Sequence, residues 1–300
     1  MNVIREIVID DLPLFRRGKV RDTYQIGDDL LMVASDRISA FVVVLPTSIP
    51  HKGTVLTQLS RFWFEQTASI APNHMVTANV ERFPPDVERL APLLAGRSMI
   101  VRRAERIDIE CVVRGYIAGS AWQEYQSAGT VRGEPLATGL RQSQRLDEPI
   151  FTPAIKNDEG HDENISVRTL SDRVGTQLAG QLEAMSLRLF QAAAALALRR
   201  GIIVADTKFE FGFIDGNLSV IDEMVTPDSS RFWDAETYQP GKDQPSFDKQ
   251  YVRNWLNEIG WNKQPPGPDL PAEVVAGTAR RYSEAYKRLT GSPLRNGAKA

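Results

Sequence analysis

Charged residues alternate along one segment whose apolar neighbours mark it as a strand. Residues 203–214 read IVADTKFEFGFI, with Asp206, Lys208 and Glu210 at every second position. Successive side chains of a strand point to opposite faces, so these three share one face. A second apolar run follows a turn and ends at Asp222. The pattern predicts a β-hairpin that carries several carboxylates.

The length of the turn decides whether Asp222 faces Glu210. A two-residue loop, Asp215-Gly216, pairs Phe209 with Asp222 and puts the two acids on opposite faces. A three-residue loop sets Glu210 directly opposite Asp222, where two carboxylates repel unless a proton or cation lies between them. Such oxygen ligands suit Mg²⁺, which usually keeps waters and phosphate oxygens as well. The alternative is an exposed face with a Lys208 ion pair.

Three other segments have residues suited to anions. Gly18 and Lys19 precede a predicted strand, where backbone and ammonium can approach a phosphate, although the Walker A spacing is missing. Arg114 is followed by Ser120 at an expected helix start, and a helix N-terminus with an arginine favours anions. Arg231 can bind a phosphate or carboxylate through two hydrogen bonds. An ordinary turn or surface arginine is the alternative for each.

The polar segment 153–166, PAIKNDEGHDENIS, contains Lys156, His161 and Asp162 and has the composition of a loop that could close over a site. The chain has three histidines and one cysteine, Cys111. His161 has no second histidine at metal-ligand spacing, so the sequence argues against a zinc enzyme.

The elements that must position these residues indicate an α+β protein. The sequence predicts a hairpin around 27–29, an amphipathic helix over 54–68, two strands over 97–117, and a helix capped by Ser120 and ended by Gly129. We expect a loop over 129–149, one or two helices from 166 to Gly201, and closing helices near 247–258 and 271–289.

The bulk composition excludes several functional classes. The chain has 300 residues, 42% hydrophobic, 25% charged, and a formal net charge of −2. This balance gives no electrostatic reason to bind nucleic acid or a membrane surface. We find no signal peptide and no apolar run long enough for a membrane span. The sequence thus predicts a cytoplasmic protein, and it leaves monomer and homo-oligomer both open.

Seven segments, in order along the chain, closely resemble the SAICAR synthetases, the phosphoribosylaminoimidazole-succinocarboxamide synthases. They read GKVRDTY, SDRISAF, IPHKGTVLTQLSRFWFE, VVRGYIAGSAW, PIFTPAIKNDEGHDENIS, ADTKFEFG and VIDEMVTPDSSRFWD. The resemblance covers about residues 15 to 255. It implies two α+β lobes related to ATP-grasp enzymes, with antiparallel sheets and flanking helices. Residues 1–113 would form the lobe with the nucleotide phosphate loop, and residues 114–300 the lobe with the metal and substrate site.

The resemblance also implies a reaction and its ligands. ATP and L-aspartate would react with carboxyaminoimidazole ribonucleotide (CAIR) to give SAICAR, ADP and phosphate through an acyl phosphate, with Mg²⁺ present. Residues implied to act on ATP or the metal are Gly18, Lys19, Arg21, Lys156, Asp162, Asp206, Lys208, Glu210 and Asp222. Residues implied to bind CAIR or aspartate are Arg37, Ser39, Arg114, Ser120 and Arg231.

Two positions depart from the family pattern. The segment SDRISAF is usually followed by aspartate, but Val42 stands here, and Ile155 replaces a threonine before Lys156. One alternative is therefore a nucleotide- or CAIR-binding homologue with impaired catalysis. Another is a different ATP-dependent ligase or phosphotransferase that uses the same cleft. Arg114 and Arg231 favour a phosphorylated co-substrate and hence the nucleotide ligase.

Overall fold

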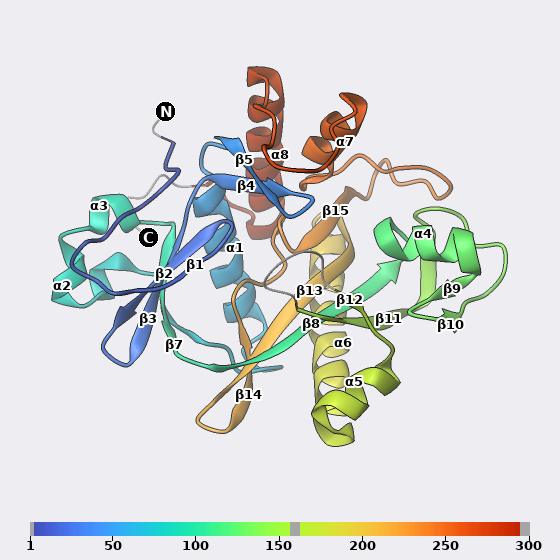
Figure 1. The fold of residues 1–300 in the computed structure, drawn as a ribbon, viewed down its shortest axis with the longest axis horizontal. Helices are drawn as coiled ribbons and strands as arrows, with labels where there is room; N and C mark the ends of the chain where they lie inside the picture. Colours follow the sequence, from blue (N-terminus) through green and yellow to red (C-terminus); the bar gives the residue numbers. More distant parts are fainter. Residues whose placement is uncertain (1–2, 157–162, 295–300) are drawn as a thin grey trace.

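A computed structural model describes residues 3–156 and 163–294 and contains two separate larger antiparallel sheets with helices around them (Figure 1). The first sheet has the order β1-β2-β3-β7-β6. Its strands are β1 (Leu14–Arg17), β2 (Arg21–Ile26), β3 (Asp29–Ala34), β7 (Ser98–Arg102) and β6 (Met75–Thr77). The short strands β4 (Arg37–Ala40) and β5 (Val43–Ser48) form a hairpin of their own, followed by α1 (Lys52–Gln66).

The two faces of the first sheet serve different purposes. In β3, Leu31 and Val33 pack into a core with residues around the short helices α2 (Pro85–Glu88) and α3 (Ala91–Leu94). The alternate residues, Leu30 and Met32, line a cavity on the other face. The period of two along the strand separates a buried face from a ligand-facing one.

The second sheet has the order β12-β11-β8-β13-β14, and β15 pairs with β13. Its strands are β12 (Glu163–Asn164), β11 (Arg145–Ile155), β8 (Glu105–Tyr116), β13 (Ile202–Ile214), β14 (Asn217–Ile221) and β15 (Ser230–Asp234). The long helix α6 (Thr176–Arg199) runs beside this sheet, with α5 (Val167–Val174) next to it (Figure 1). Leu182, Leu189 and Phe190 of α6 are buried with Cys111 and Phe209 of the sheet in the main core.

The remaining elements lie at the ends of this sheet. Helix α4 (Gly119–Ala128) and the small hairpin of β9 (Thr130–Val131) and β10 (Glu134–Pro135) form one group. The closing helices α7 (Gln250–Glu258) and α8 (Ala272–Thr290) pack together near the β4–β5 hairpin (Figure 1). The α+β class with antiparallel sheets and flanking helices is confirmed.

Several local expectations were wrong. Helix α4 begins at Gly119 with Ala118 as its N-cap, so Ser120 lies inside the first turn and does not cap the helix. The expected loop over 129–149 contains β9 and β10, and β11 already begins at Arg145. The first sheet ends at Arg102 and β8 pairs only within the second sheet, so the sheets separate at residues 103–104. A division of lobes after residue 113 stays a prediction.

The β4–β5 turn holds Val42 in a strained backbone conformation. Ala40 pairs with Val43, and the two loop residues, Phe41 and Val42, have φ of 50° and 64°. Two successive positive φ angles form a type I′ turn, which favours Asn and Gly. A β-branched residue in this region is an outlier because its Cβ crowds the backbone.

We expect Val42→Asn to stabilise the protein, because asparagine tolerates the left-handed conformation that valine resists. The free energy of unfolding should rise by about 1 kcal/mol, which corresponds to roughly 2–4 °C in the unfolding midpoint. Thermal unfolding measures the effect. Val44→Asn is the matched control, because Val44 lies in the strand, where asparagine is disfavoured. An unchanged midpoint in Val42→Asn would show that the turn is unstrained.

Candidate active site

The strand pair β8–β13 brings together the charged residues of the cleft. Asp206 pairs in register with Arg114, and Glu210 with Glu110. Side chains at even positions of both strands face the cleft, whereas odd-numbered residues such as Cys111 and Phe209 face α6 and the core. The predicted common face of Asp206, Lys208 and Glu210 is confirmed.

The larger cavity of the cleft has a volume of about 430 Å³ and lies between this face and the first sheet. One end is apolar, lined by Leu30, Met32, Val101 and Ala104. The other end is charged, lined by the turn around Gly18 and Lys19 and by the acids and lysines of the second sheet. The lining therefore offers apolar surface to a flat group and cations to a polyanionic chain.

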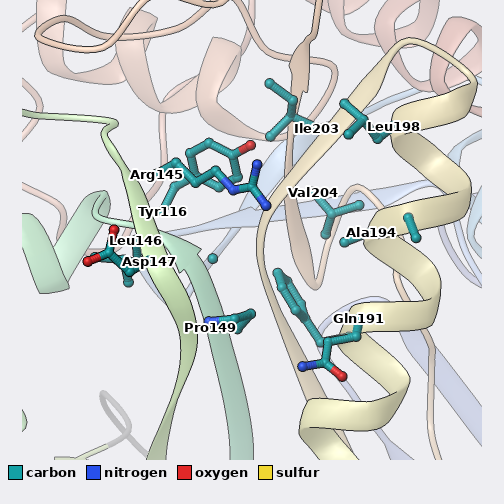
Figure 2. A pocket seen from close by; sticks show the side chains of 13 residues that line it. Tyr116, Arg145, Leu146, Asp147, Pro149, Gln191, Ala194, Leu198, Ile203 and Val204 are labelled. Carbon is teal, nitrogen blue, oxygen red and sulfur yellow. The ribbon is translucent and has the colours of Figure 1, made fainter.

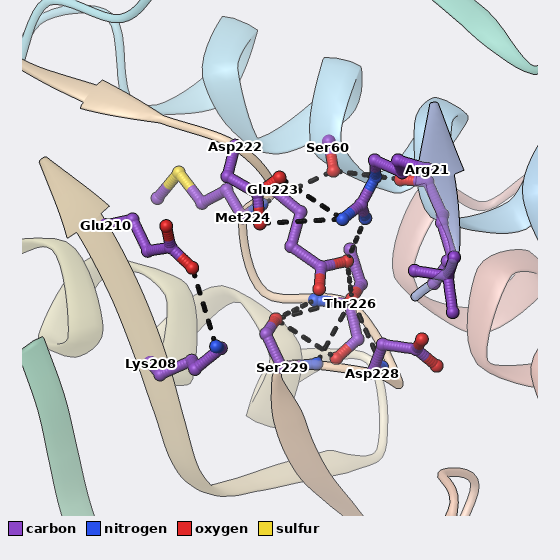
Figure 3. A network of polar contacts seen from close by, with 12 residues as sticks. Arg21, Ser60, Lys208, Glu210, Asp222, Glu223, Met224, Thr226, Asp228 and Ser229 are labelled. Carbon is purple, nitrogen blue, oxygen red and sulfur yellow. Dashed lines mark hydrogen bonds and ion pairs between the residues drawn. The ribbon is translucent and has the colours of Figure 1, made fainter. Parts of the chain in front are cut away.

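Glu210 is the centre of a buried charge cluster at the polar end. Its carboxylate pairs with Lys156 and is 3.5 Å from Nζ of Lys208, which also pairs with Glu110 (Figure 3 shows the Lys208–Glu210 contact). Burial opposes ionisation, but Lys208 and Lys156 outweigh it and lower the pKa of Glu210 to about 2. Glu210 and Lys208 are therefore both charged at neutral pH.

Asp222 reaches this cavity by an unexpected route. Ile214 pairs with Asn217 and Glu210 with Ile221, so the loop has two residues, Asp215-Gly216. That register predicts opposite faces for Glu210 and Asp222, yet both line the cavity. Strand β14 ends at Ile221, and Asp222 adopts a left-handed backbone with φ of 63°, which ends the alternation.

Arg21, on β2 of the first sheet, holds the Asp222 carboxylate. Its Nη1 lies 3.3 Å from Oδ1 of Asp222, and its Nη2 pairs with Glu223 (Figure 3). Burial acts against the charged guanidinium, but Glu223 and Asp222 outweigh it and raise the pKa of Arg21. Thr226 donates to Glu223 at 2.6 Å, which fixes the loop after β14. The cluster spans both sheets.

A smaller cavity of about 190 Å³ adjoins the first and has the features of an anion site. Arg114 and Arg231 both pair with Asp206, and Nη2 of Arg114 lies 3.3 Å from Oγ of Ser120. Asp206 raises the pKa of Arg231, which stays charged. Gly119 lets the Arg231 guanidinium lie close to the start of α4, because a Cβ at position 119 would lie 2.1 Å from Nη2 of Arg231.

Asp206 lies apart from Glu210 and Asp222, the two acids of the larger cavity. Its carboxylate lies between two guanidinium groups in the smaller cavity, which differs from the expected metal position beside Glu210 and Asp222. Within residues 3–156 and 163–294, no three His, Cys, Asp or Glu side chains gather closely enough to hold a metal ion. A metal at Glu210 and Asp222 would need phosphate oxygens or waters as further ligands.

The other expected site residues fall into three groups. Lys19, Ser39, Lys156 and Lys208 line the larger cavity. Arg37 is buried beneath the 18–21 turn, where it donates to the carbonyls of Gly18 and Lys19 and pairs with Asp22 at 2.8 Å. Its direct contact with a ligand stays a prediction. Asp162 lies outside the described residues.

Sequence reasoning missed residues that only the fold brings to the cleft. Lys249 and Asp228 line both cavities, and Arg253 on α7 lines the smaller one. Glu110 was not considered, because its significance depends on pairing with Glu210. The apolar end was also missed, since Leu30 and Met32 read simply as strand residues.

Asp228 neutralises a lysine that has no access to water. Lys52 of α1 is fully buried, and its Nζ lies 2.7 Å from Oδ2 of Asp228. Lys249 contacts the same oxygen at 3.1 Å, and the Tyr282 hydroxyl donates to Oδ1 at 2.7 Å. Burial lowers the pKa of Lys52 to about 8, with Asp228 acting in the opposite direction.

We expect Asp228→Asn to destabilise the protein by about 3–5 kcal/mol, because it leaves the buried ammonium of Lys52 without a counter-charge. Urea unfolding measures the loss. Asp215→Asn is the control, since Asp215 is exposed and its pair with Arg102, which water screens, should contribute little. Adding Lys52→Met to Asp228→Asn should restore part of the stability. Equal effects of the two Asp→Asn changes would contradict this role.

A further cavity, of about 350 Å³, lies between the second sheet and α6 (Figure 2). Ala194, Leu198, Ile203 and Val204 contribute apolar walls, and Arg145 extends from β11 at one side. It lacks the paired acids and lysines of the cleft. We do not assign the reactants to it.

The two departures from the family pattern lie outside the cleft cavities. Val42 is at the exposed β4–β5 turn, and Ile155 packs partly buried against the main core. Neither lines the larger or the smaller cavity. Nothing in the described structure favours the catalytically impaired alternative.

Comparison with known proteins shows the family of this chain. Residues 14–268 match the SAICAR synthetase family. The chain belongs to the SAICAR synthetase family. A phosphoribosylaminoimidazole-succinocarboxamide synthase of Pelobacter propionicus is 52% identical over 284 residues, covering 94% of this chain and 96% of the relative. One of Thioalkalivibrio sulfidiphilus is 53% identical over 287 residues, covering 95% and 97%.

Solved SAICAR synthetases share the fold. The structure described as SAICAR-synthase from Saccharomyces cerevisiae complexed with SAICAR aligns with a TM-score of 0.87 at 41% identity, covering 97% of this chain and 99% of that one. A SAICAR synthetase in complex with ADP aligns with a TM-score of 0.69 at 25% identity, covering 93% and 99%. In the part of the chain that the structure describes, no helix is both long and apolar enough to cross a membrane.

Proposed function

We propose that this member of the SAICAR synthetase family joins L-aspartate to the carboxylate of CAIR, with ATP converted to ADP and phosphate. The observation that carries the proposal is the pair of adjoining cavities. One combines an apolar end with paired acids and lysines, and the other holds Arg114, Arg231 and Ser120. An adenine nucleotide and a phosphorylated co-substrate meet where the cavities share Lys208 and Asp228.

ATP would occupy the larger cavity. Its adenine fits the apolar end, and its phosphates extend toward Gly18, Lys19 and the lysines of the second sheet. Lys156 and Lys208 neutralise Glu210 in the free protein and would transfer to phosphate oxygens when the nucleotide enters. Arg21 would remain between the bound nucleotide and the carboxylate of Asp222.

Glu210 and Asp222 would hold Mg²⁺. Both offer carboxylate oxygens to the same cavity, which are the ligands that Mg²⁺ prefers, and phosphate oxygens would complete its coordination. When bound, Mg²⁺ would neutralise charge on the phosphates during transfer. Glu110 would keep Lys208 in place as Glu210 changes partners.

CAIR would bind with its 5′-phosphate in the smaller cavity. Arg231 and Arg114 supply the charge, and Ser120 supplies a hydroxyl at the start of α4. The CAIR carboxylate then points toward Lys208 and the γ-phosphate. Lys249, which lines both cavities, stands where it can meet the negative charge of L-aspartate or of CAIR.

The chemistry proceeds in two displacements. A carboxylate oxygen of CAIR attacks the γ-phosphorus of ATP, and ADP leaves. The amine of L-aspartate attacks the acyl carbon of the acyl phosphate, phosphate leaves, and the nitrogen releases its proton. All reactants are anionic, so the chain contributes chiefly by positioning them and neutralising charge.

Phosphate release from ATP and Mg²⁺ tests the proposal when CAIR and L-aspartate are omitted in turn. We expect release to require both. The Val42→Asp variant, measured beside the unchanged chain, should differ little in rate because Val42 lines neither cavity. Activity only in Val42→Asp would support the impaired alternative. Release with neither substrate would indicate ATP hydrolysis in place of ligation.

A further inference from the structure

The turn that carries Lys19 is held from beneath by the segment that follows β3. Arg37 donates through Nε to the carbonyl of Lys19 at 3.0 Å and through Nη2 to the carbonyl of Gly18 at 3.1 Å. Ser35 donates to the carbonyl of Val20 through its backbone N–H and its hydroxyl, both at 2.9 Å. Successive carbonyls of the turn are therefore bound by one short segment.

Arg37 uses its whole guanidinium group within the chain. A guanidinium has five N–H donors. Besides the two carbonyls of the turn, Nη1 donates to the carbonyl of Arg5 at 2.9 Å, and Nη2 and Nη1 donate to the carboxylate of Asp22 at 2.8 and 3.3 Å. The residue is 8% exposed and lines neither cavity of the cleft. Each donor of Arg37 is thus directed at another part of the chain.

The direction of the bound carbonyls determines what the turn presents on its other side. In a trans peptide, the C=O and the N–H of the next residue point in opposite directions. Because the carbonyls of Gly18 and Lys19 point at Arg37, the N–H groups of Lys19 and Val20 point away from it. The turn lines the larger cavity and Arg37 does not. The turn therefore offers backbone N–H groups to the cavity beside the ammonium of Lys19, an arrangement that suits anions.

We propose that Arg37 is a positioning residue for the nucleotide: it binds the carbonyls of Gly18 and Lys19 and so keeps backbone N–H groups, in place of carbonyl oxygens, facing the ATP phosphates. A carbonyl turned toward the cavity would repel a phosphate, whereas an N–H attracts it. Asp22, which is 1% exposed, orients Arg37 through both carboxylate oxygens. The inference rests on the proposed function to the extent that the ATP phosphates meet this turn. Arg37 acts through the turn and touches no reactant.

Arg37→Lys keeps the charge, but its three donors on one atom cannot reach both carbonyls and Asp22 together. The probes are ADP with Mg²⁺ and adenosine, with dissociation constants measured by isothermal titration calorimetry. We expect Arg37→Lys to weaken ADP binding about tenfold, the order of one lost charge-assisted hydrogen bond. Adenosine binding should change less than about twofold, because adenosine has no phosphate for the turn. The KM for ATP should rise with the ADP constant, while the KM values for CAIR and L-aspartate stay within about twofold.

Arg97→Lys is the matched control for a general disturbance of the first sheet. Arg97 is buried like Arg37, donates to the carbonyl of Ala34 at 3.1 Å and pairs with Asp36 at 3.2 Å, but it lines neither cavity of the cleft. We expect Arg97→Lys to lower the thermal unfolding midpoint as Arg37→Lys does and to leave ADP binding within about twofold. Equal losses of ADP affinity in the two variants would overturn the proposal.

Two other results would also overturn it. A higher KM for CAIR or L-aspartate with unchanged ADP affinity would show that Arg37 binds that substrate directly. Normal ADP binding by Arg37→Lys, where Lys19→Gln weakens it, would refute the positioning role alone. Normal ADP binding by Lys19→Gln would instead refute the proposed place of the ATP phosphates. If Arg37→Lys does not fold, Asp22→Asn makes the same comparison, because it leaves Arg37 in place without the charge that orients it.

Discussion

Replacing Glu210 with glutamine is expected to reduce turnover at least about a thousandfold at ordinary Mg²⁺ concentrations. The variant keeps the shape of the side chain but removes the charge that would meet both the metal and the two lysines. In the free protein, Lys156 and Lys208 pair with this carboxylate, and they hold its pKa far below the usual range against the effect of burial. Loss of the charge therefore disturbs metal and cation positions together.

Initial rates of phosphate release across a range of Mg²⁺ concentrations measure this effect. Glu105→Gln is the matched control, because Glu105 is an exposed acid on the neighbouring strand β8 and lines neither cavity of the cleft. It should retain nearly full activity. If Glu210→Gln kept more than a tenth of the unchanged rate, Glu210 would not be a metal ligand.

Replacing Arg231 with alanine is expected to raise the KM for CAIR about a hundredfold or more and the KM for ATP by less than about threefold. Arg231 and Arg114 share Asp206. Without Arg231, Asp206 neutralises the guanidinium of Arg114, so this pair of arginines no longer leaves a net positive charge for a phosphate, although Lys249 and Arg253 still line the cavity. The effect on ATP is small, since Arg231 lines only the smaller cavity.

Two further variants test the role of Arg231 in binding CAIR. Arg231→Lys keeps a charge but not the planar fork, and should recover only part of the CAIR affinity. Arg145→Ala removes an arginine from the opposite side of the sheet (Figure 2), and should change neither KM. An equal rise of both KM values in Arg231→Ala would show that the 5′-phosphate binds elsewhere.

Strand periodicity was sufficient to predict part of this site. The common face of Asp206, Lys208 and Glu210 follows from alternation within β13, a property of the local chain. The separation of Asp206 from the other acids does not follow from this alternation. It depends on Arg114, which lies 92 residues earlier in the sequence. The family resemblance supplied the reaction, but it did not supply these neighbours.

Other features had no local signal. Whether Asp222 faces the cleft depends on one backbone angle, and Arg21 contacts its carboxylate from a distant segment. Lys249 and Arg253 follow a proline-bearing connection, and nothing in that stretch indicates that the start of α7 meets the cleft. Helix α4 has its N-cap at Ala118, two residues before the serine that suggested it, and Gly119 at its start leaves space for Arg231.

The pairing of each cleft acid with a cation of the chain has a thermodynamic consequence. On the proposed assignment, metal alone would have to compete with Lys156 and Lys208 for Glu210, and nucleotide alone would have to attract lysines that Glu210 already neutralises. Together, each would free the partner that the other requires. Linkage would then make Mg²⁺ and ATP raise each other's affinity by the same factor, so the cleft would select the metal–nucleotide complex over either component.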